Sequence, residues 1–422
     1  MKTRILLLWT LLFGVALIAI CGGMQGTLLG IRGRLEGFSL ASVGIIMSAY
    51  YAGFLIGAPV APMLVRQVGH IRVFAALASL GSVATLIYST FIDPLIWSLL
   101  RLSMGFCVAG MFIVAESWLN NICTNENRGR LLSVYMFTVT SGFAGGQLLI
   151  IVSPATGYES FILASVILSI AIIPILLSNI SAPVIAQAEY LKLGKLVRIT
   201  PLGSVAIFIH GITFSSLMWL TPVFGVQHGF SASVSALLAG TMMLGGLASQ
   251  LPVGRLSDRQ DRRHTLLLLS LVGAGAGLLA PLTVDLNNFW PLAVMLFVVG
   301  AAVQPFYSVA ASHLNDHLRS EQILSASGSI ILISGSGGLL GPLISSQTMS
   351  AFGPDSLYYL VALAYGFMAL FALYRISVRP PIAVEEQSPA MAIGLQTSQV
   401  VIAQAMDETD QGSPLAPEEA TD

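Results

Sequence analysis

Two ionisable side chains occupy one apolar stretch of the sequence, RLSMGFCVAGMFIVAESWLNN, residues 101–121. A charged side chain at the centre of a bilayer costs about 2.5–3.5 kcal/mol even on the lenient insertion scale, so such residues usually face protein or water. If the stretch is helical, the 116 − 101 = 15 residues from Arg101 to Glu116 separate the two charges by about 22 Å along the axis, with an angular offset of about 60°. The two charges therefore share one helix face but serve opposite ends of it.

Each of the two charges has two interpretations. Arg101 either positions a substrate or an interior carbonyl group, or it has a purely structural hydrogen-bonding role. Glu116 lies near the bases Arg128, Arg130 and Arg66 at the same end of the spans, which favours a structural ion-pair network, with proton transfer as the alternative.

The composition decides the class of protein. Hydrophobic residues make up 55% of the 422 residues and charged residues only 9%, whereas soluble domains usually carry about 25% charged residues. The chain is therefore a membrane protein. It has no basic block of the kind that binds nucleic acid, and its three cysteines lack the spacing of a disulfide framework or a zinc site.

The helices that must position these charges follow from the apolar runs. We count twelve runs of roughly twenty residues, each long enough to cross a bilayer. The first resembles a secretory signal, but it is long enough to span and many spans follow. We predict an all-α membrane protein with a six-helix bundle over residues 1–178, a linker over 179–199, a second bundle over 200–379, and a disordered acidic tail over 380–422.

The positive charges predict the orientation. Of the 19 Lys and Arg residues, sixteen fall at the ends of the spans that share a side with the N-terminus, two fall on the opposite side, and Arg101 lies within a span. Because short cytoplasmic loops accumulate Lys and Arg, both termini are predicted to be cytoplasmic.

The two halves of the sequence repeat each other. AESWLN at 115–120 aligns with AASHLN at 310–315, an offset of 310 − 115 = 195 residues. The same offset places Gly105 on Gly300 and Gly146 on Gly341, in two different pairs of spans. Many transporter folds are built from such duplicated units, with the substrate bound between the repeats.

One loop carries a family motif. GRLSDRQDRR, residues 254–263, resembles the signature loop of the major facilitator superfamily, although Asp261 stands where the family usually has glycine. In the first half the motif has decayed to PMLVRQVGHIR. Arg101 and Gly105 resemble the RxxxG motif of the family's fourth helix, and ESWLN followed by RGR resembles its YcaD-like branch.

The resemblance covers the twelve spans and implies a transporter that works by alternating access. Charged pairs at a helix end can hold a neighbouring helix in one conformation and release it in another, because such pairs are strong when dry and weak when wet. We therefore predict a cytoplasmic gate; the alternative is that these bases only satisfy the positive-inside bias. The predicted gate residues are Asp258, Arg259, Arg262, Arg263, Arg128 and Arg130.

Polar residues within the spans indicate where a solute could bind. The third, sixth, ninth and twelfth spans lack Gln, Asn, His and charged residues in their interiors, so we expect these spans to face lipid and the others to enclose a cavity. His210 could carry a proton or bind substrate, or it could hold a neutral hydrogen bond between helices. The candidate lining residues are Gln25, Tyr50, Tyr51, Arg101, Gln147, His210, Ser215, Trp219, Gln304, Tyr307 and Ser308.

We therefore expect a multi-pass, monomeric transporter of the bacterial inner membrane that moves a small solute. Proton coupling, if present, would use Glu116 or His210. We expect no enzyme activity, cofactor, metal site or nucleic-acid partner, since the sequence has no HExxH, GxSxG or phosphate-binding loop. A membrane sensor or scaffold that retains the transporter fold is the alternative, because a fold does not dictate function.

Overall fold

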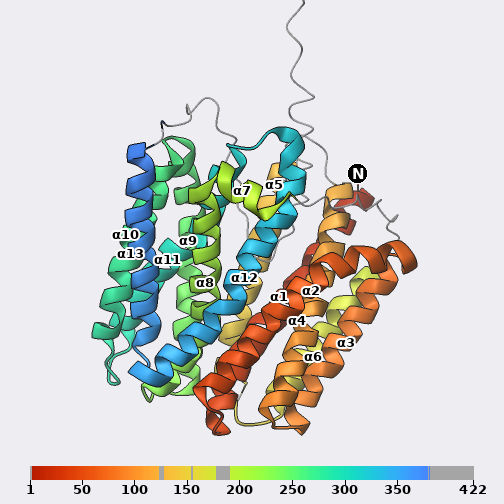
Figure 1. Ribbon diagram of the computed structural model, residues 1–422. Helices are drawn as coiled ribbons and strands as arrows, with labels where there is room; N and C mark the ends of the chain where they lie inside the picture. Colours follow the sequence, from red (N-terminus) through yellow and green to blue (C-terminus); the bar gives the residue numbers. More distant parts are fainter. Residues whose placement is uncertain (1, 123–127, 154, 177–190, 379, 381–422) are drawn as a thin grey trace, which may run out of the picture.

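The computed structural model describes residues 2–122, 128–153, 155–176, 191–378 and 380, and all regular structure in these ranges is helical (Figure 1). The first half contains α1 (Lys2–Leu35), α2 (Leu40–Val68), α3 (His70–Thr90), α4 (Pro94–Ile122), α5 (Arg128–Leu148), η1 (Leu149–Ile151) and α6 (Glu159–Leu176). The second contains α8 (Pro201–Gln227), α9 (Ala232–Asp258), α10 (Arg262–Leu279), η2 (Ala280–Thr283), α11 (Trp290–Asn315), α12 (Ser320–Phe352) and α13 (Ser356–Val378), preceded by α7 (Leu193–Ile199).

Twelve of these helices are long and apolar enough to span a membrane, which confirms the predicted number of spans. The short helix α7 was not predicted, because its seven residues lie inside the expected linker. Figure 1 shows α7 and the start of α1 at the same end of the bundle, which we call the N-terminal face. The opposite end, where α1 finishes, is the far face. The predicted acidic tail lies outside the described residues.

One of the helices expected to face lipid, α6, carries an exposed apolar stripe. On α6 the exposed residues Ile162, Val166, Ile170 and Ile173 recur every three or four positions. This spacing follows one side of a helix, so α6 presents an apolar stripe outward. By contrast, α1 and α8 are the most buried helices, with 78% and 72% of their most hydrophobic windows inside the structure.

The two halves share their turns as well as their helices. Gly37 and Gly229 adopt positive φ angles of 82° and 91°, a conformation that favours glycine. Two residues later, Ser39 and Ser231 cap α2 and α9, each accepting a hydrogen bond from a backbone N–H three residues on. Both pairs are related by 229 − 37 = 231 − 39 = 192 residues, so the turn GFS occurs at equivalent places in the two halves.

Close helix contacts follow the same repeat. A side chain at Gly105 on α4 would collide with the carbonyl oxygen of Tyr50 on α2, and one at Gly300 on α11 would collide with that of Met242 on α9. Gly146 packs against the backbone of α1 in the same way as Gly341 packs against α8. The predicted alignment of Gly105 with Gly300 and of Gly146 with Gly341 therefore reflects equivalent packing in the folded chain.

The halves contact each other mainly where α1 packs on α8, α2 on α12 and α5 on α9. Several of these contacts form at glycines. Gly30 faces Val223, and Gly44 faces Ser346. These positions lie between the middle of the helices and the far face, so the far end of the bundle is where the halves are closed against each other.

Candidate functional site

The buried charge Arg101 is the centre of a polar cluster in the first half. Its Nη1 donates a hydrogen bond of 2.9 Å to Gln25 Oε1 on α1, and Gln25 Nε2 donates one of 2.8 Å to Thr85 Oγ1 on α3. Thr85 in turn donates to the Gly81 carbonyl within its own helix. All three linked side chains are fully buried, so this chain of hydrogen bonds joins α1, α3 and α4 inside the bundle.

Two aromatic rings cover the guanidinium group of Arg101. Its carbon lies 4.8 Å from the ring centroid of Tyr50 and 4.7 Å from that of Trp219, which is within the range of cation–π attraction. The two rings also meet edge to face, with centroids 5.6 Å apart. Tyr50 belongs to the first half and Trp219 to the second, so the cluster spans the boundary between the halves.

Glycines place both rings. Gly105 lies one turn after Arg101 and lets α2 approach α4 closely enough for Tyr50 to reach the guanidinium group. Gly26 on α1 leaves room for Trp219, whose ring occupies the volume that a side chain at position 26 would take. The RxxxG spacing therefore has a physical reason here, because the arginine and the glycine that seats its aromatic neighbour belong to one packing unit.

Four of the predicted cavity residues thus come together: Gln25, Tyr50, Arg101 and Trp219. Tyr51 is adjacent, with its ring centroid 5.4 Å from that of Tyr50, and it packs against Gly338 of the second half.

A second polar group lies within the second half alone. The His210 ring on α8 stacks on Phe214 at 5.2 Å and lies 5.3 Å from the Tyr307 ring on α11. Gln250 on α9 donates a hydrogen bond of 2.8 Å to Ser308. These contacts link α8, α9 and α11 and leave His210 almost completely buried.

Three further predicted lining residues have mainly local surroundings. Gln304 packs its amide group against Gly246 of α9. Ser215 donates to the Ile212 carbonyl of its own helix. Gln147 is fully buried near the far end of α5, and neither polar atom of its side chain has a hydrogen-bond partner among the described residues.

Glu116 lies near the C-terminal end of α4, toward the N-terminal face of the bundle and away from Arg101. It is buried and accepts a hydrogen bond of 3.0 Å from the Tyr135 hydroxyl on α5. Arg130 is exposed, and the side chain of Arg128 lies outside the described part of the chain. The separation of Arg101 and Glu116 into two sites matches the helical spacing of the sequence.

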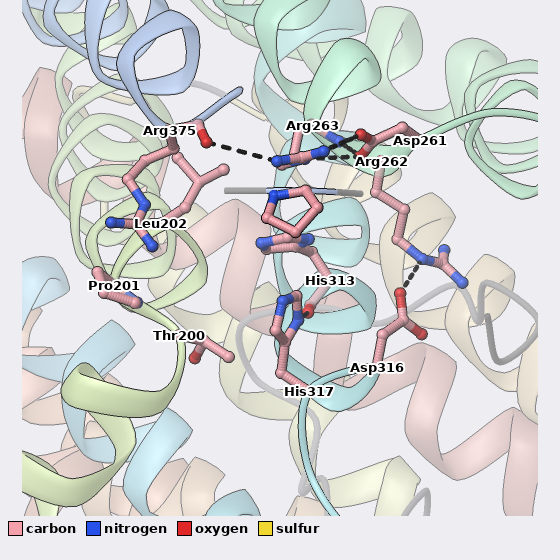
Figure 2. A pocket seen from close by; sticks show the side chains of 11 residues that line it. Thr200, Pro201, Leu202, Asp261, Arg262, Arg263, His313, Asp316, His317 and Arg375 are labelled. Atoms are coloured by element: carbon pink, nitrogen blue, oxygen red, sulfur yellow. Dashed lines mark hydrogen bonds and ion pairs between the residues drawn. The ribbon is translucent and has the colours of Figure 1, made fainter. Parts of the chain in front are cut away.

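Two of the predicted gate residues, Arg262 and Arg263, line a pocket at the N-terminal face (Figure 2). Arg262 Nε pairs with Asp316 Oδ2 at 2.6 Å, with both side chains almost completely buried, and Arg262 Nη1 lies 3.6 Å from the more exposed Asp258. Arg263 binds the carboxylate of Asp261 at 2.5 Å and donates to the carbonyl of Arg375 at 3.4 Å. Arg259 is exposed. These pairs hold α10 to α11 and α13 within one half.

Asp261 is the residue that departs from the family motif, and it has a structural role. It caps α10 by accepting a hydrogen bond of 3.0 Å from the backbone N–H of Arg263. Its partial burial opposes ionisation, but the side-chain and backbone hydrogen bonds from Arg263 outweigh that effect, so the pKa of Asp261 lies below its usual value.

Sequence reasoning missed three partners. Thr85 was unremarkable because it is one hydroxyl in an apolar span, and Asp316 because it follows a span rather than lying within one. The third is at the far face, where Arg34 at the end of α1 meets Gln227 at the end of α8. With its amide oriented for hydrogen bonding, Gln227 accepts from Arg34 Nη2 at 2.9 Å and from Nε at 2.8 Å, a contact that joins the two halves.

Comparisons with known proteins point to one family of membrane transporters. The profile of the Major Facilitator Superfamily matches residues 11–231 and again residues 203–413. An uncharacterized MFS-type transporter of Enterobacter sp. (strain 638) is 27% identical over 376 residues, covering 89% of this chain and 97% of that protein. The transporter YcaD of Escherichia fergusonii is 26% identical over 367 residues, covering 86% and 94%. A crystal structure of a mutant of the nucleoside transporter NupG has a TM-score of 0.76 at 14% identity, covering 88% of this chain and all of that one.

Proposed function

The chain belongs to the Major Facilitator Superfamily, and from that premise we propose that it carries a small solute across a bacterial inner membrane by alternating access. As a member of that superfamily it is a membrane transporter and not an enzyme. The solute, the direction of movement and the coupling are the parts that we propose.

The observation that carries the proposal is the way the two halves meet. Several of their contacts at the far face form at small residues, such as Gly44 against Ser346 and Gly30 against Val223. Small residues let helices approach without interlocking side chains, which suits surfaces that must part and meet again. The Arg34–Gln227 contact at the far face has a neutral partner and lies at a helix end, so water can replace it when the halves separate.

The orientation follows from the distribution of positive charge. Sixteen Lys and Arg residues belong to the side of the N-terminal face against two on the far side, so we place the N-terminal face, with both termini, in the cytoplasm. The far face is then periplasmic. In this orientation, the contacts between the halves at the far face would close the periplasmic side.

Two buried groups are the candidates for proton coupling. Glu116 lies between α4 and α5, held by Tyr135, and His210 lies between α8 and α11. Both lie within helices that span the membrane, where a titratable side chain is costly unless it serves a function. We propose that the protein works as a monomer, because each half contributes to the Arg101 cluster of the same chain.

Reconstitution tests the proposed function. Purified protein is first screened for solutes that raise its thermal midpoint, and the solutes that do so are then offered as labelled compounds to proteoliposomes. We expect saturable uptake, with Glu116→Gln and His210→Ala compared with wild type across a pH gradient. A solute that binds but never crosses would instead support a sensor or scaffold. Unchanged gradient dependence in both variants would remove these two residues from the coupling mechanism.

A further inference from the structure

Arg101 has hydrogen-bond capacity that the protein does not use. Its Nη1 is bound to Gln25, but Nε and Nη2 are buried and have no hydrogen-bond partner, and no acid among the described residues forms an ion pair with it. Leaving charged donors buried and unpaired is costly, so such a group usually has a partner in some state of the protein.

The two unused nitrogens lie on the same edge of the guanidinium group. The Nε–H and one Nη2–H of an arginine point in parallel and form a fork that matches the two oxygens of a carboxylate. The rings of Tyr50 and Trp219 lie 4.8 and 4.7 Å from the guanidinium carbon, and their centroids are 5.6 Å apart, so they lie on neighbouring sides of the group and not on its two opposite faces. Neither ring supplies a hydrogen-bond acceptor to Nε or Nη2, so this edge is the one that a carboxylate can bind, in the plane of the guanidinium group.

The repeat shows that the fold does not require this charge. The residue equivalent to Arg101 in the second half is Leu296, since 101 + 195 = 296, and the equivalent of Gln25 is Leu217, since 25 + 192 = 217. Both leucines are fully buried, and the glycine contacts around them match those of the first half. The equivalent helices of the second half thus pack with apolar residues at these two positions, so the buried arginine occurs in one half only and the packing does not require it.

We propose that the free edge of Arg101 binds the carboxylate group of the transported solute, which makes the substrate a small organic monoanion. The proposal rests on the proposed transport function and names its substrate class. One positive charge balances one carboxylate. Among the described residues the other buried arginines, Arg262 and Arg263, lie at the N-terminal face and are paired with acids. A dianion would leave its second charge uncompensated.

Access to the site is linked to the contact between the halves. Trp219 covers one face of the guanidinium group from the second half and is seated on Gly26 of the first. Separation of α1 from α8 at the far face would withdraw this ring and uncover the arginine. Closure would return the indole and leave the carboxylate bound at the free edge of Arg101, with the apolar part of the solute near Tyr50, Tyr51 and Trp219.

Thermal stability of the full-length protein in detergent tests the proposal. The probes are acetate, lactate, benzoate and phenylacetate, each compared at equal concentration with its neutral carboxamide at pH 7. We expect at least one carboxylate to raise the midpoint of wild type while its amide does not. In Arg101→Leu the dissociation constant of that carboxylate should rise at least about tenfold, because a charge-assisted pair is lost.

Two further variants keep the outcome interpretable. Arg101→Lys retains the charge without the pair of parallel donors, so it should bind the carboxylate more weakly than wild type and more tightly than Arg101→Leu. If the leucine variant does not fold, the lysine variant replaces it in the comparison with wild type. Arg255→Leu removes an exposed base of α9 and should bind as wild type does. The proposal is overturned if no carboxylate in the panel stabilises the protein, if the amides stabilise it equally, or if Arg101→Leu binds unchanged.

Uptake measurements separate this proposal from the proposed function. If a carboxylate binds at Arg101 but never crosses the membrane, the proposed anion site stands and the proposed transport function is refuted. If a neutral solute crosses at the same rate in wild type and in Arg101→Leu, the proposed transport function stands and the proposed anion site is refuted.

Discussion

The contact between Gly105 and Tyr50 gives a prediction with an internal control. An alanine at position 105 would place its Cβ against the Tyr50 carbonyl oxygen, so α2 and α4 must move apart by about 1.5 Å to restore an ordinary contact. Overpacking of this kind costs about 1–3 kcal/mol. Because Tyr50 would move with its helix, its ring would no longer lie 4.8 Å above the guanidinium carbon of Arg101.

Gly300→Ala is the matched control, since its Cβ would meet the Met242 carbonyl in the equivalent place of the second half. Both variants should unfold at lower temperature by similar amounts, measured by thermal denaturation in detergent. Only Gly105→Ala should also weaken binding of the stabilising carboxylate. Equal loss of binding in both variants, or no loss of stability in either, would refute the reasoning that links this glycine to the site.

Three further predictions concern the ends of the helices. Asp316→Asn should destabilise the protein by about 3–5 kcal/mol because it removes the buried carboxylate that Arg262 Nε binds at 2.6 Å. By contrast, Asp258→Asn, at a pair that is 3.6 Å long and partly exposed, should cost under about 1 kcal/mol; chemical denaturation compares them. The pKa of Asp261 is lowered in the folded state. Its contribution to the free energy of unfolding is therefore present above the unfolded pKa and is lost as pH falls through the folded pKa. Asp261→Asn should make the free energy of unfolding fall less steeply with decreasing pH in the acid range. Ser39→Ala and Ser231→Ala remove equivalent helix caps, and each should lower stability by about 1 kcal/mol in a thermal denaturation series, with similar values for both.

Much of the architecture could be predicted because it depends on properties that a sequence displays. Apolar runs of membrane length gave the number of spans, and the aligned glycines gave the repeat, which the structure shows as backbone contacts at Gly105 and Gly300. The short helix α7 was not predicted, because seven residues show too little periodicity for a helix to be recognised inside a linker.

The site was harder to predict, because partner choice is a matter of three-dimensional packing. The sequence pointed to Arg101, Tyr50 and Trp219 as polar or aromatic residues within spans, but not to the contact of the guanidinium group with both rings. His210 looked equally suitable, yet it lies with Tyr307 in a separate group. Which edge of the arginine is occupied and which is free depends on the folded arrangement of α1, α3 and α4.

The central claim is that the halves close and open at the far face, and a distance measurement tests it most directly. Spin labels at Leu35→Cys and Phe352→Cys, exposed positions at the far ends of α1 and α12, would report the separation of the halves in a background without the native cysteines. Labels at Leu35→Cys and Phe91→Cys lie in one half and serve as the control.

We expect the pair that spans the halves to show a short and a longer population. The stabilising carboxylate should change their ratio, and Gln227→Ala should increase the longer one by removing the contact with Arg34. The control pair should keep one distance throughout. A single unchanged distance between Leu35 and Phe352 under all these conditions would contradict alternating access in this protein.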